Sequence, residues 1–296
     1  MGTLERNKSR LRANLYMACA LVLVISATLQ VVSLVSYARE EAFLVALMNR
    51  IASPSLPPSE QAIAISNFLS DKSDRSNRQY FLLPVFGFLR PTAEEVASAG
   101  GDCADQSRLT IVLLGLRNIH AEKWALYDPT MKPHHAVVEL DSEHGKMVID
   151  PLFNLWFPRP EGGYYGIESL RQNPEILSQR VRDLAARTDD PVRDDQYRLR
   201  EYPLNRYIYT NARTINWEKS PAMHLAYRIL HALLGDRANY ISRPEFAERP
   251  ALMVVYGAII PEVLALIVLL GAAGREKRMT FPRRTALDPR MSSSPG

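Results

Sequence analysis

Two long apolar runs constrain this chain most, because each is long enough to cross a membrane. Residues 13–38 contain no charged side chain, and residues 251–274 contain one, Glu262. The hydrocarbon core of a bilayer needs about 20 apolar residues in a helix. We therefore expect transmembrane helices over 13–38 and 251–274. The residues between them, 39–249, would fold as a domain outside the lipid.

Basic residues flank both runs on their outer sides and indicate the orientation. They are Arg6, Lys8, Arg10 and Arg12 before the first run, and Arg275, Lys277, Arg278, Arg283, Arg284 and Arg290 after the second. The positive-inside rule then predicts cytoplasmic tails over 1–12 and 275–296. We expect a two-pass protein of the cytoplasmic (inner) membrane whose main domain is periplasmic or otherwise extracytoplasmic.

A cleaved signal peptide ending at Ser36-Tyr37-Ala38 is the alternative for the first run. Its apolar stretch exceeds the 7–15 residues that are usual in a signal peptide, which favours an uncleaved anchor. Both interpretations place the main domain outside.

The distribution of charge argues against a nucleic-acid partner. The chain carries a net charge of +4 and has a pI near 9.0, but the N- and C-terminal tails contribute +3 and +4, whereas residues 39–249 contribute −2. The excess of basic residues therefore lies in the tails that flank the two apolar runs. Glu262 stands out because a carboxylate inside a bilayer is costly. Glu262 could be protonated, face a neighbouring helix or lie at a kink made by Pro261; the functional alternative is a contact with a membrane-protein partner.

The central domain mixes helical and strand patterns, which predicts an α+β fold. Helices are expected over 59–70, after the Thr92–Glu95 capping box, and from Asp102 onwards. Strands are expected over 121–127, 135–140 and 146–150, the last two forming a hairpin. The core would cover about 59–157. A helical extension would cover 158–249, with a charged helix over 167–187 and another between Ser220 and Gly235.

Cys103 is the first candidate for chemistry. The chain has two cysteines, Cys19 and Cys103, which excludes a disulfide framework. Cys103 follows the predicted N-cap Asp102, and the first turn of a helix favours thiolate over thiol. A small buried hydrophobe is the alternative for a free cysteine.

The predicted hairpin adds a base and an orienting acid. A short turn over 141–145 places His135 opposite or beside Asp150, where the carboxylate can orient the imidazole. His134 would be the base if the register differed, because a strand alternates its faces. A strand-borne base facing a helix-terminal thiol is the arrangement of thiol acyl transfer.

Three ordered motifs give the chain a resemblance to a known superfamily. They are Gly101-Asp102-Cys103, His135-Ala136-Val137-Val138-Glu139 and Asp150-Pro151. Residues 100–157 thus resemble the core of the transglutaminase-like superfamily, including bacterial transglutaminase-like cysteine proteinases. The resemblance implies a papain-like core, with the Cys-bearing helix packed on an antiparallel sheet. It also implies a triad of Cys103, His135 and Asp150. Val137 departs from the family, in which an aromatic residue often follows His-Ala.

The remaining site predictions are negative or weak. The Cys103 backbone N–H would be one oxyanion donor, with Tyr80 or a nearby backbone group as the second. No cofactor is expected; calcium at Asp102 and Asp105, which some related proteinases bind, is a weak alternative to helix capping. The histidines show no zinc spacing with cysteines.

Two functions follow from these predictions. The first is a membrane-anchored cysteine enzyme that acts on amide or peptide bonds of a peptide, protein or cell-envelope substrate. It would be a protease or amidase, or a transglutaminase-type acyltransferase. The second is a non-catalytic module that binds a peptide or envelope polymer within a membrane complex.

Overall fold

The computed structural model describes residues 2–70, 81–82, 89–185 and 208–280. The chain divides into two compact units: residues 1–33 with 254–296, and residues 34–253. The sequence is polar over 71–79 and 188–198, and both segments lie outside the described residues, as does Tyr80.

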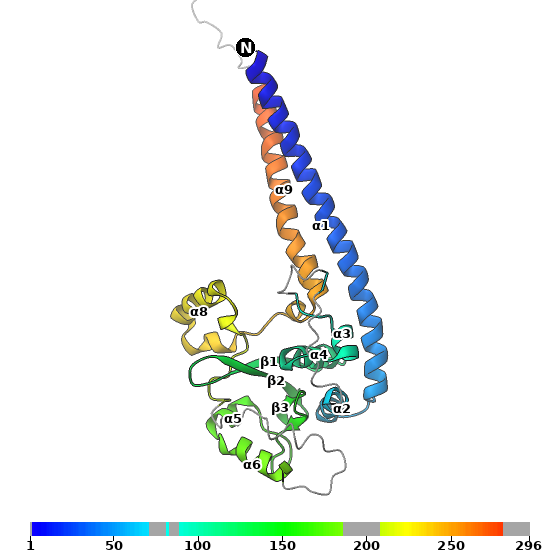
Figure 1. The fold of residues 1–296 in the computed structure, drawn as a ribbon, viewed down its shortest axis with the longest axis vertical. Coiled ribbons are helices and arrows are strands. Elements are labelled where there is room, and N and C mark those ends of the chain that lie inside the picture. Colours follow the sequence, from blue (N-terminus) through cyan, green and yellow to red (C-terminus); the bar gives the residue numbers. More distant parts are fainter. Residues whose placement is uncertain (1, 71–80, 83–88, 186–207, 281–296) are drawn as a thin grey trace, which may run out of the picture. The chain divides into compact units, whose positions relative to one another are not determined.

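The first unit is a pair of helices. It contains most of α1 (Gly2–Ile51) and most of α9 (Pro250–Thr280), which run side by side in this unit (Figure 1). The segments Arg10–Ile51 and Pro250–Gly274 are both long and apolar enough to cross a membrane. The structure therefore contains two candidate membrane helices, as the sequence predicted, and α1 continues beyond the predicted span through residues 39–51.

Small and polar side chains pack at the contact between these two helices. Cys19, Ser26 and Ser33 are buried at seven-residue steps along α1, and Ala258 and Ala265 are buried at the same step in α9. This seven-residue spacing places the small buried side chains along one side of each helix.

Glu262 takes part in the same helix pair. The Gln30 side-chain amide donates a hydrogen bond to Glu262 Oε2 at 3.2 Å. Among the interpretations of Glu262, the structure supports a contact with the neighbouring helix.

The second unit is built on a four-stranded antiparallel sheet in the order β1-β2-β3-β4. The strands are β1 (Ala121–Tyr127), β2 (Pro133–Ser142), β3 (Gly145–Asp150) and β4 (Leu155–Trp156). The three expected strands are present, and β2 extends beyond its predicted ends. The short β4 was not predicted, because two residues carry no periodic pattern.

The hairpin register differs slightly from the expected one. Ser142 pairs with Gly145, so the turn consists only of Glu143 and His144. Gly145 has φ of 105°, a conformation that favours glycine and allows this tight turn. If this register is continued to the ends of β2 and β3, Asp150 lies diagonally across from His135 and not directly opposite it. Both side chains still share a face.

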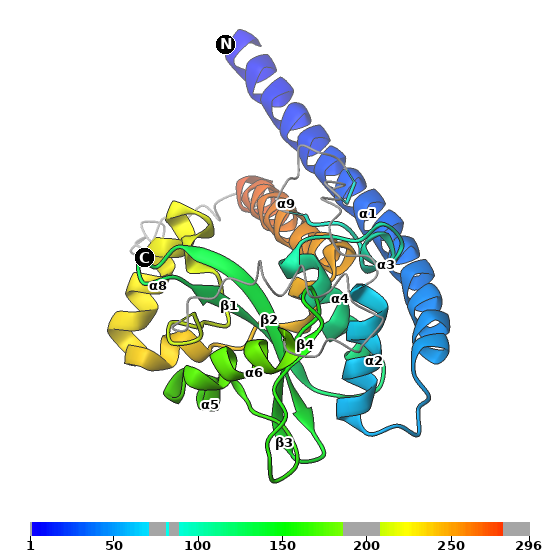
Figure 2. The same ribbon diagram turned by 60° about the horizontal axis from the view of Figure 1, so that its bottom comes forward.

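Both faces of the sheet are covered (Figure 2). One core joins the sheet to the end of α1 and to α2 (Pro58–Ser70), α3 (Ala93–Ala99) and α4 (Cys103–Gly115). The other core joins the opposite face to α5 (Ile167–Gln172) and α6 (Glu175–Ala185). Val138 belongs to the first core and its neighbour Val137 to the second, as strand alternation requires.

The helix starts confirm the capping predictions, with one correction. Thr92 and Glu95 form the expected capping box of α3, and Asp102 caps α4. The single charged helix expected over 167–187 is instead two helices. The break falls at Asn173-Pro174, because proline lacks a backbone N–H and disfavours helical conformation in the residue before it.

The C-terminal part of this unit consists of short helices. They are η2 (Trp217–Lys219), α8 (Pro221–Leu234), η3 (Gly235–Tyr240) and η4 (Glu245–Glu248). Ser220 caps α8 and Gly235 follows its last residue, as predicted.

Candidate active site

The N-terminus of α4 positions Cys103. Asp102 Oδ1 accepts a hydrogen bond from the Asp105 backbone N–H at 2.9 Å, which makes Cys103 the first residue of the helix. The Ser107 hydroxyl donates to the carbonyl of Ala136 at 3.2 Å and attaches α4 to β2. Cys103 is partly buried and not disulfide-bonded. The thiol therefore lies at the positive end of a helix dipole.

His135 and Asp150 form a buried pair next to this helix end. His135 Nε2 lies 2.5 Å from Asp150 Oδ2, and the two side chains are 3% and 0% exposed. The other carboxylate oxygen accepts from the backbone N–H groups of Leu152 and Phe153 at 3.1 and 3.2 Å. The Phe153 ring stands edge-on to the imidazole, with centroids 5.3 Å apart. Both groups are therefore held in one orientation.

The environment of His135 favours its protonated form. Burial by itself lowers the pKa of this imidazole, but the charge and hydrogen bond of Asp150, together with a hydrogen bond to Cys103, raise the pKa to about 10. Because Nε2 faces Asp150, Nδ1 is the nitrogen left for the sulfur. The structure thus brings the three predicted residues Cys103, His135 and Asp150 together, with the imidazole between the sulfur and the carboxylate.

His134, the alternative base, has a different neighbour. Its side chain is 44% exposed and its Nε2 lies 2.8 Å from Asp128 Oδ2. Strand alternation explains the difference, because adjacent residues of β2 point to opposite sides. The geometry therefore favours His135 as the base.

Sequence reasoning missed Arg90, which braces the start of α4. Its Nε donates to Asp105 at 2.9 Å and one Nη to Asp102 at 2.6 Å. Burial opposes ionisation of Asp102, but the Arg90 guanidinium outweighs it and lowers the pKa of that carboxyl. No spacing rule links Arg90 to these carboxylates, so the sequence carried no signal for it. Both carboxylates suggested for calcium contact this guanidinium, and calcium stays a prediction.

We expect Arg90→Ala to lower the free energy of unfolding by about 1–2 kcal/mol, because it leaves buried Asp105 with weaker hydrogen bonding. Arg108 lies 3.4 Å from Asp105 and remains as a partial partner. Urea denaturation of the full chain in detergent would measure the loss. Arg90→Lys should recover part of it; equal stability of Arg90→Ala and the parent would contradict this role.

Asp150 also depends on residues outside the predicted triad. Leu152 and Phe153 follow Asp150-Pro151 in a turn, and their N–H groups bind the carboxylate. An aspartate whose side chain accepts from backbone two or three residues later is a recognised turn pattern. The Asp-Pro pair was therefore the available signal for these two donors.

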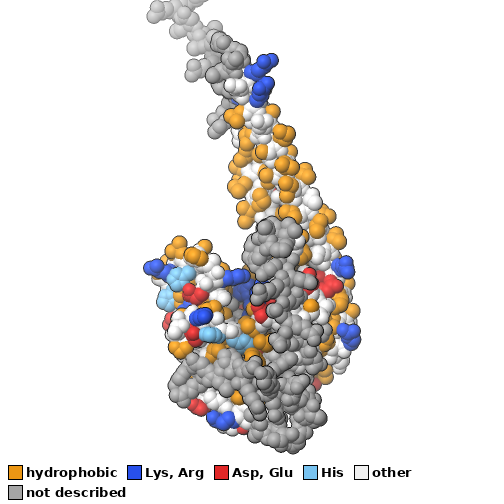
Figure 3. Space-filling view, viewed as in Figure 1, with side chains coloured by type: hydrophobic (Ala, Val, Ile, Leu, Met, Phe, Trp, Pro, Cys, Tyr) orange, Lys and Arg blue, Asp and Glu red, His pale blue; other side chains and the backbone are white. Residues whose placement is uncertain are grey.

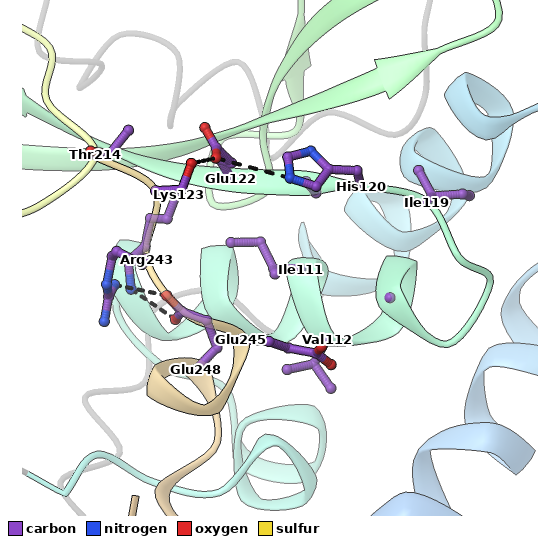
Figure 4. Close-up of a pocket in the computed structure, with 13 residues that line it drawn as sticks. Ile111, Val112, Ile119, His120, Glu122, Lys123, Thr214, Arg243, Glu245 and Glu248 are labelled. Atoms are coloured by element: carbon purple, nitrogen blue, oxygen red, sulfur yellow. Dashed lines mark hydrogen bonds and ion pairs between the residues drawn. The ribbon is translucent and has the colours of Figure 1, made fainter. Parts of the chain in front are cut away.

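A cavity of about 260 Å³ lies beside the C-terminal half of α4, between that helix, β1 and η4. Figure 4 shows Arg243 and Glu248 facing each other in it; their side chains are 2.8 Å apart, and Lys123 lies 3.2 Å from Glu248. Burial lowers the pKa of Lys123 to about 8. None of the triad residues lines this cavity, so it is separate from the candidate active site.

Comparison of the chain with known protein families, curated proteins and solved structures finds no match. The resemblance to the transglutaminase-like superfamily therefore stays a prediction. Within the described ranges, no group of three or more His, Cys, Asp or Glu side chains could hold a metal ion.

Proposed function

We propose that this chain is a membrane-anchored cysteine enzyme of transglutaminase-like type that acts on amide or peptide bonds. The observation that carries the proposal is the buried contact of Asp150 with His135, whose imidazole also hydrogen-bonds Cys103 at the start of α4. A nucleophile, a base and a group that orients the base are the minimum set for covalent acyl transfer. The α+β arrangement around them is compatible with a papain-like core.

In the proposed reaction, His135 already holds the proton of the Cys103 thiol, as its raised pKa favours, and the thiolate attacks the carbonyl carbon of an amide. The Cys103 backbone N–H, at the helix start, is a candidate donor to the developing oxyanion. The C–N bond then breaks, His135 returns its proton to the leaving amine, and a thioester remains on Cys103. Asp150 holds the imidazole in its orientation and stabilises the imidazolium throughout.

The acyl group then passes to a second nucleophile. Water gives a carboxylic acid and makes the protein a protease or amidase, whereas a primary amine gives a new amide and makes it a cross-linking enzyme. We favour water, because no motif in the sequence indicates a dedicated amine site. In both cases His135 takes the proton of the incoming nucleophile and the thiolate leaves.

The two candidate spans supply the proposed location. Inserted in a bilayer with both tails in the cytoplasm, α1 and α9 would hold the sheet-bearing unit against the outer face of the cytoplasmic membrane. Its substrates would then be extracytoplasmic peptides, proteins or envelope polymers. The Gln30–Glu262 contact would satisfy one polar group of each span inside the lipid.

A product analysis tests the proposed reaction. The full chain in detergent is incubated with peptides that contain glutamine and asparagine, with and without a fluorescent alkyl amine, and the products are identified by mass spectrometry. We expect cleavage, deamidation or amine incorporation, together with a thioester adduct on Cys103. Cys103→Ala should abolish the products, whereas His134→Gln, altered at the exposed neighbour of His135, should retain them. Products that persist in Cys103→Ala would refute the mechanism.

A further inference from the structure

Helix α8 is amphipathic but presents its apolar side to solvent. Leu225, Ile229 and Leu233 recur at four-residue steps and are 57%, 54% and 75% exposed. No residue of this 14-residue helix is buried. Figure 3 shows hydrophobic side chains at the surface of α8 beside its histidines. An ordinary surface helix packs its apolar stripe against the core, so this orientation is reversed.

The opposite side of α8 is the one that holds it to the domain. The Tyr227 hydroxyl donates to Asn239 at 3.2 Å, and the guanidinium of Arg213 lies 4.3 Å from the Tyr227 ring centroid. Arg213 is in turn bonded through its backbone to Ala125 in β1. At about 100° per residue, Tyr227 points roughly 160° away from both Leu225 and Ile229. The apolar ridge is therefore directed outward by specific contacts.

We infer that α8 is a membrane-interface helix whose ridge of Leu225, Ile229 and Leu233 lies in the lipid headgroup region; this inference rests on the proposed membrane anchoring. A helix that lies on a membrane has a large apolar moment and basic residues beside its apolar face. Exposed Lys219, Arg228 and Arg237 supply the basic residues, and residues 218–237 carry a net charge of +1.

The chain itself favours lipid as the occupant of this ridge. Only 15 residues separate Leu234 from Pro250, where the second candidate span begins. A surface tethered so closely to a membrane meets it at high effective concentration. A third contact with the bilayer, besides the two spans, would restrict how the sheet-bearing unit tilts and thus where its active site faces.

Site-directed spin labelling of the full chain tests this inference. In a Cys19→Ala, Cys103→Ala background, a nitroxide is attached at Ile229→Cys, at His224→Cys or at Leu21→Cys. His224 is the matched control, because it is exposed on the same helix but about 140° from Ile229. Leu21 reports on the first span. The protein is placed in vesicles of phosphatidylcholine with phosphatidylglycerol, and collisions with oxygen and with a water-soluble nickel chelate are compared.

We expect the oxygen-to-nickel collision ratio at Ile229→Cys to be several times that at His224→Cys and to approach that at Leu21→Cys. A high ratio at Leu21→Cys with equal, low ratios on α8 would overturn the inference and leave the anchoring intact. Low ratios at all three positions would overturn both. Spin–spin broadening at Ile229→Cys alone would assign the ridge to a second copy of the chain instead of lipid.

Discussion

Replacement of Asp150 by alanine is expected to lower the free energy of unfolding by about 3–5 kcal/mol, the usual loss when one partner of a buried charged pair is removed. The side chain is fully buried and accepts three hydrogen bonds, one from His135 and two from backbone N–H groups. Its removal leaves all three donors without that acceptor. Urea denaturation of the full chain in detergent measures the change, with Asp128→Ala, which removes the partly exposed partner of His134, as the matched control.

The pH dependence of stability separates the ionic part of this effect. The folded state raises the pKa of His135 from its usual 6.5 to about 10, so the pair stabilises the fold fully below pH 6.5. That stabilisation is lost as the pH rises towards 10, with a slope of at most about 1.4 kcal/mol per pH unit for one group. Asp150→Asn should flatten this slope between pH 7 and 9. A slope unchanged in Asp150→Asn would show that the His135–Asp150 ion pair does not form.

The second large effect concerns the reactivity of Cys103. In His135→Gln the sulfur loses its cationic partner, and we expect its alkylation by iodoacetamide at pH 6 to slow at least tenfold, because the thiolate is the reactive form. His134→Gln should react like the parent, since His134 contacts Asp128 and not the triad. Peptide mapping by mass spectrometry distinguishes Cys103 from Cys19. Equal slowing in both histidine variants would point to a general change in the fold rather than to a specific partner.

Local patterns predicted much of the fold. The caps at Thr92, Asp102 and Ser220, the three longer strands and both apolar helices could be predicted because each has a local chemical signal. The break at Pro174 was missed although proline is such a signal, because the charged residues on both sides read as one helix. Strand β4 is held by pairing with β3 and has no pattern of its own.

The candidate site was predictable to the same degree. Cys103 was predicted from a helix start, and the His135–Asp150 pair was predicted from a hairpin. The two side chains of this pair are in contact although the register places them diagonally. The role of Arg90 was not predictable, because its contacts with Asp102 and Asp105 depend on the tertiary fold, which brings Arg90 next to the start of α4. The exposure of the apolar ridge of α8 could not be predicted from the sequence either, since the spacing of its apolar residues matches that of a helix that faces the core.

The alkylation rate of Cys103 at pH 6 tests the central claim most directly and needs no substrate. An ordinary cysteine, with a pKa near 8.5, is only about 0.3% thiolate at this pH. We compare the rate for Cys103 in the native chain with that in the same chain unfolded by urea. If His135 and the start of α4 hold the sulfur as thiolate, the native rate should be at least tenfold higher. A native rate equal to or below the unfolded rate would contradict the proposed nucleophile.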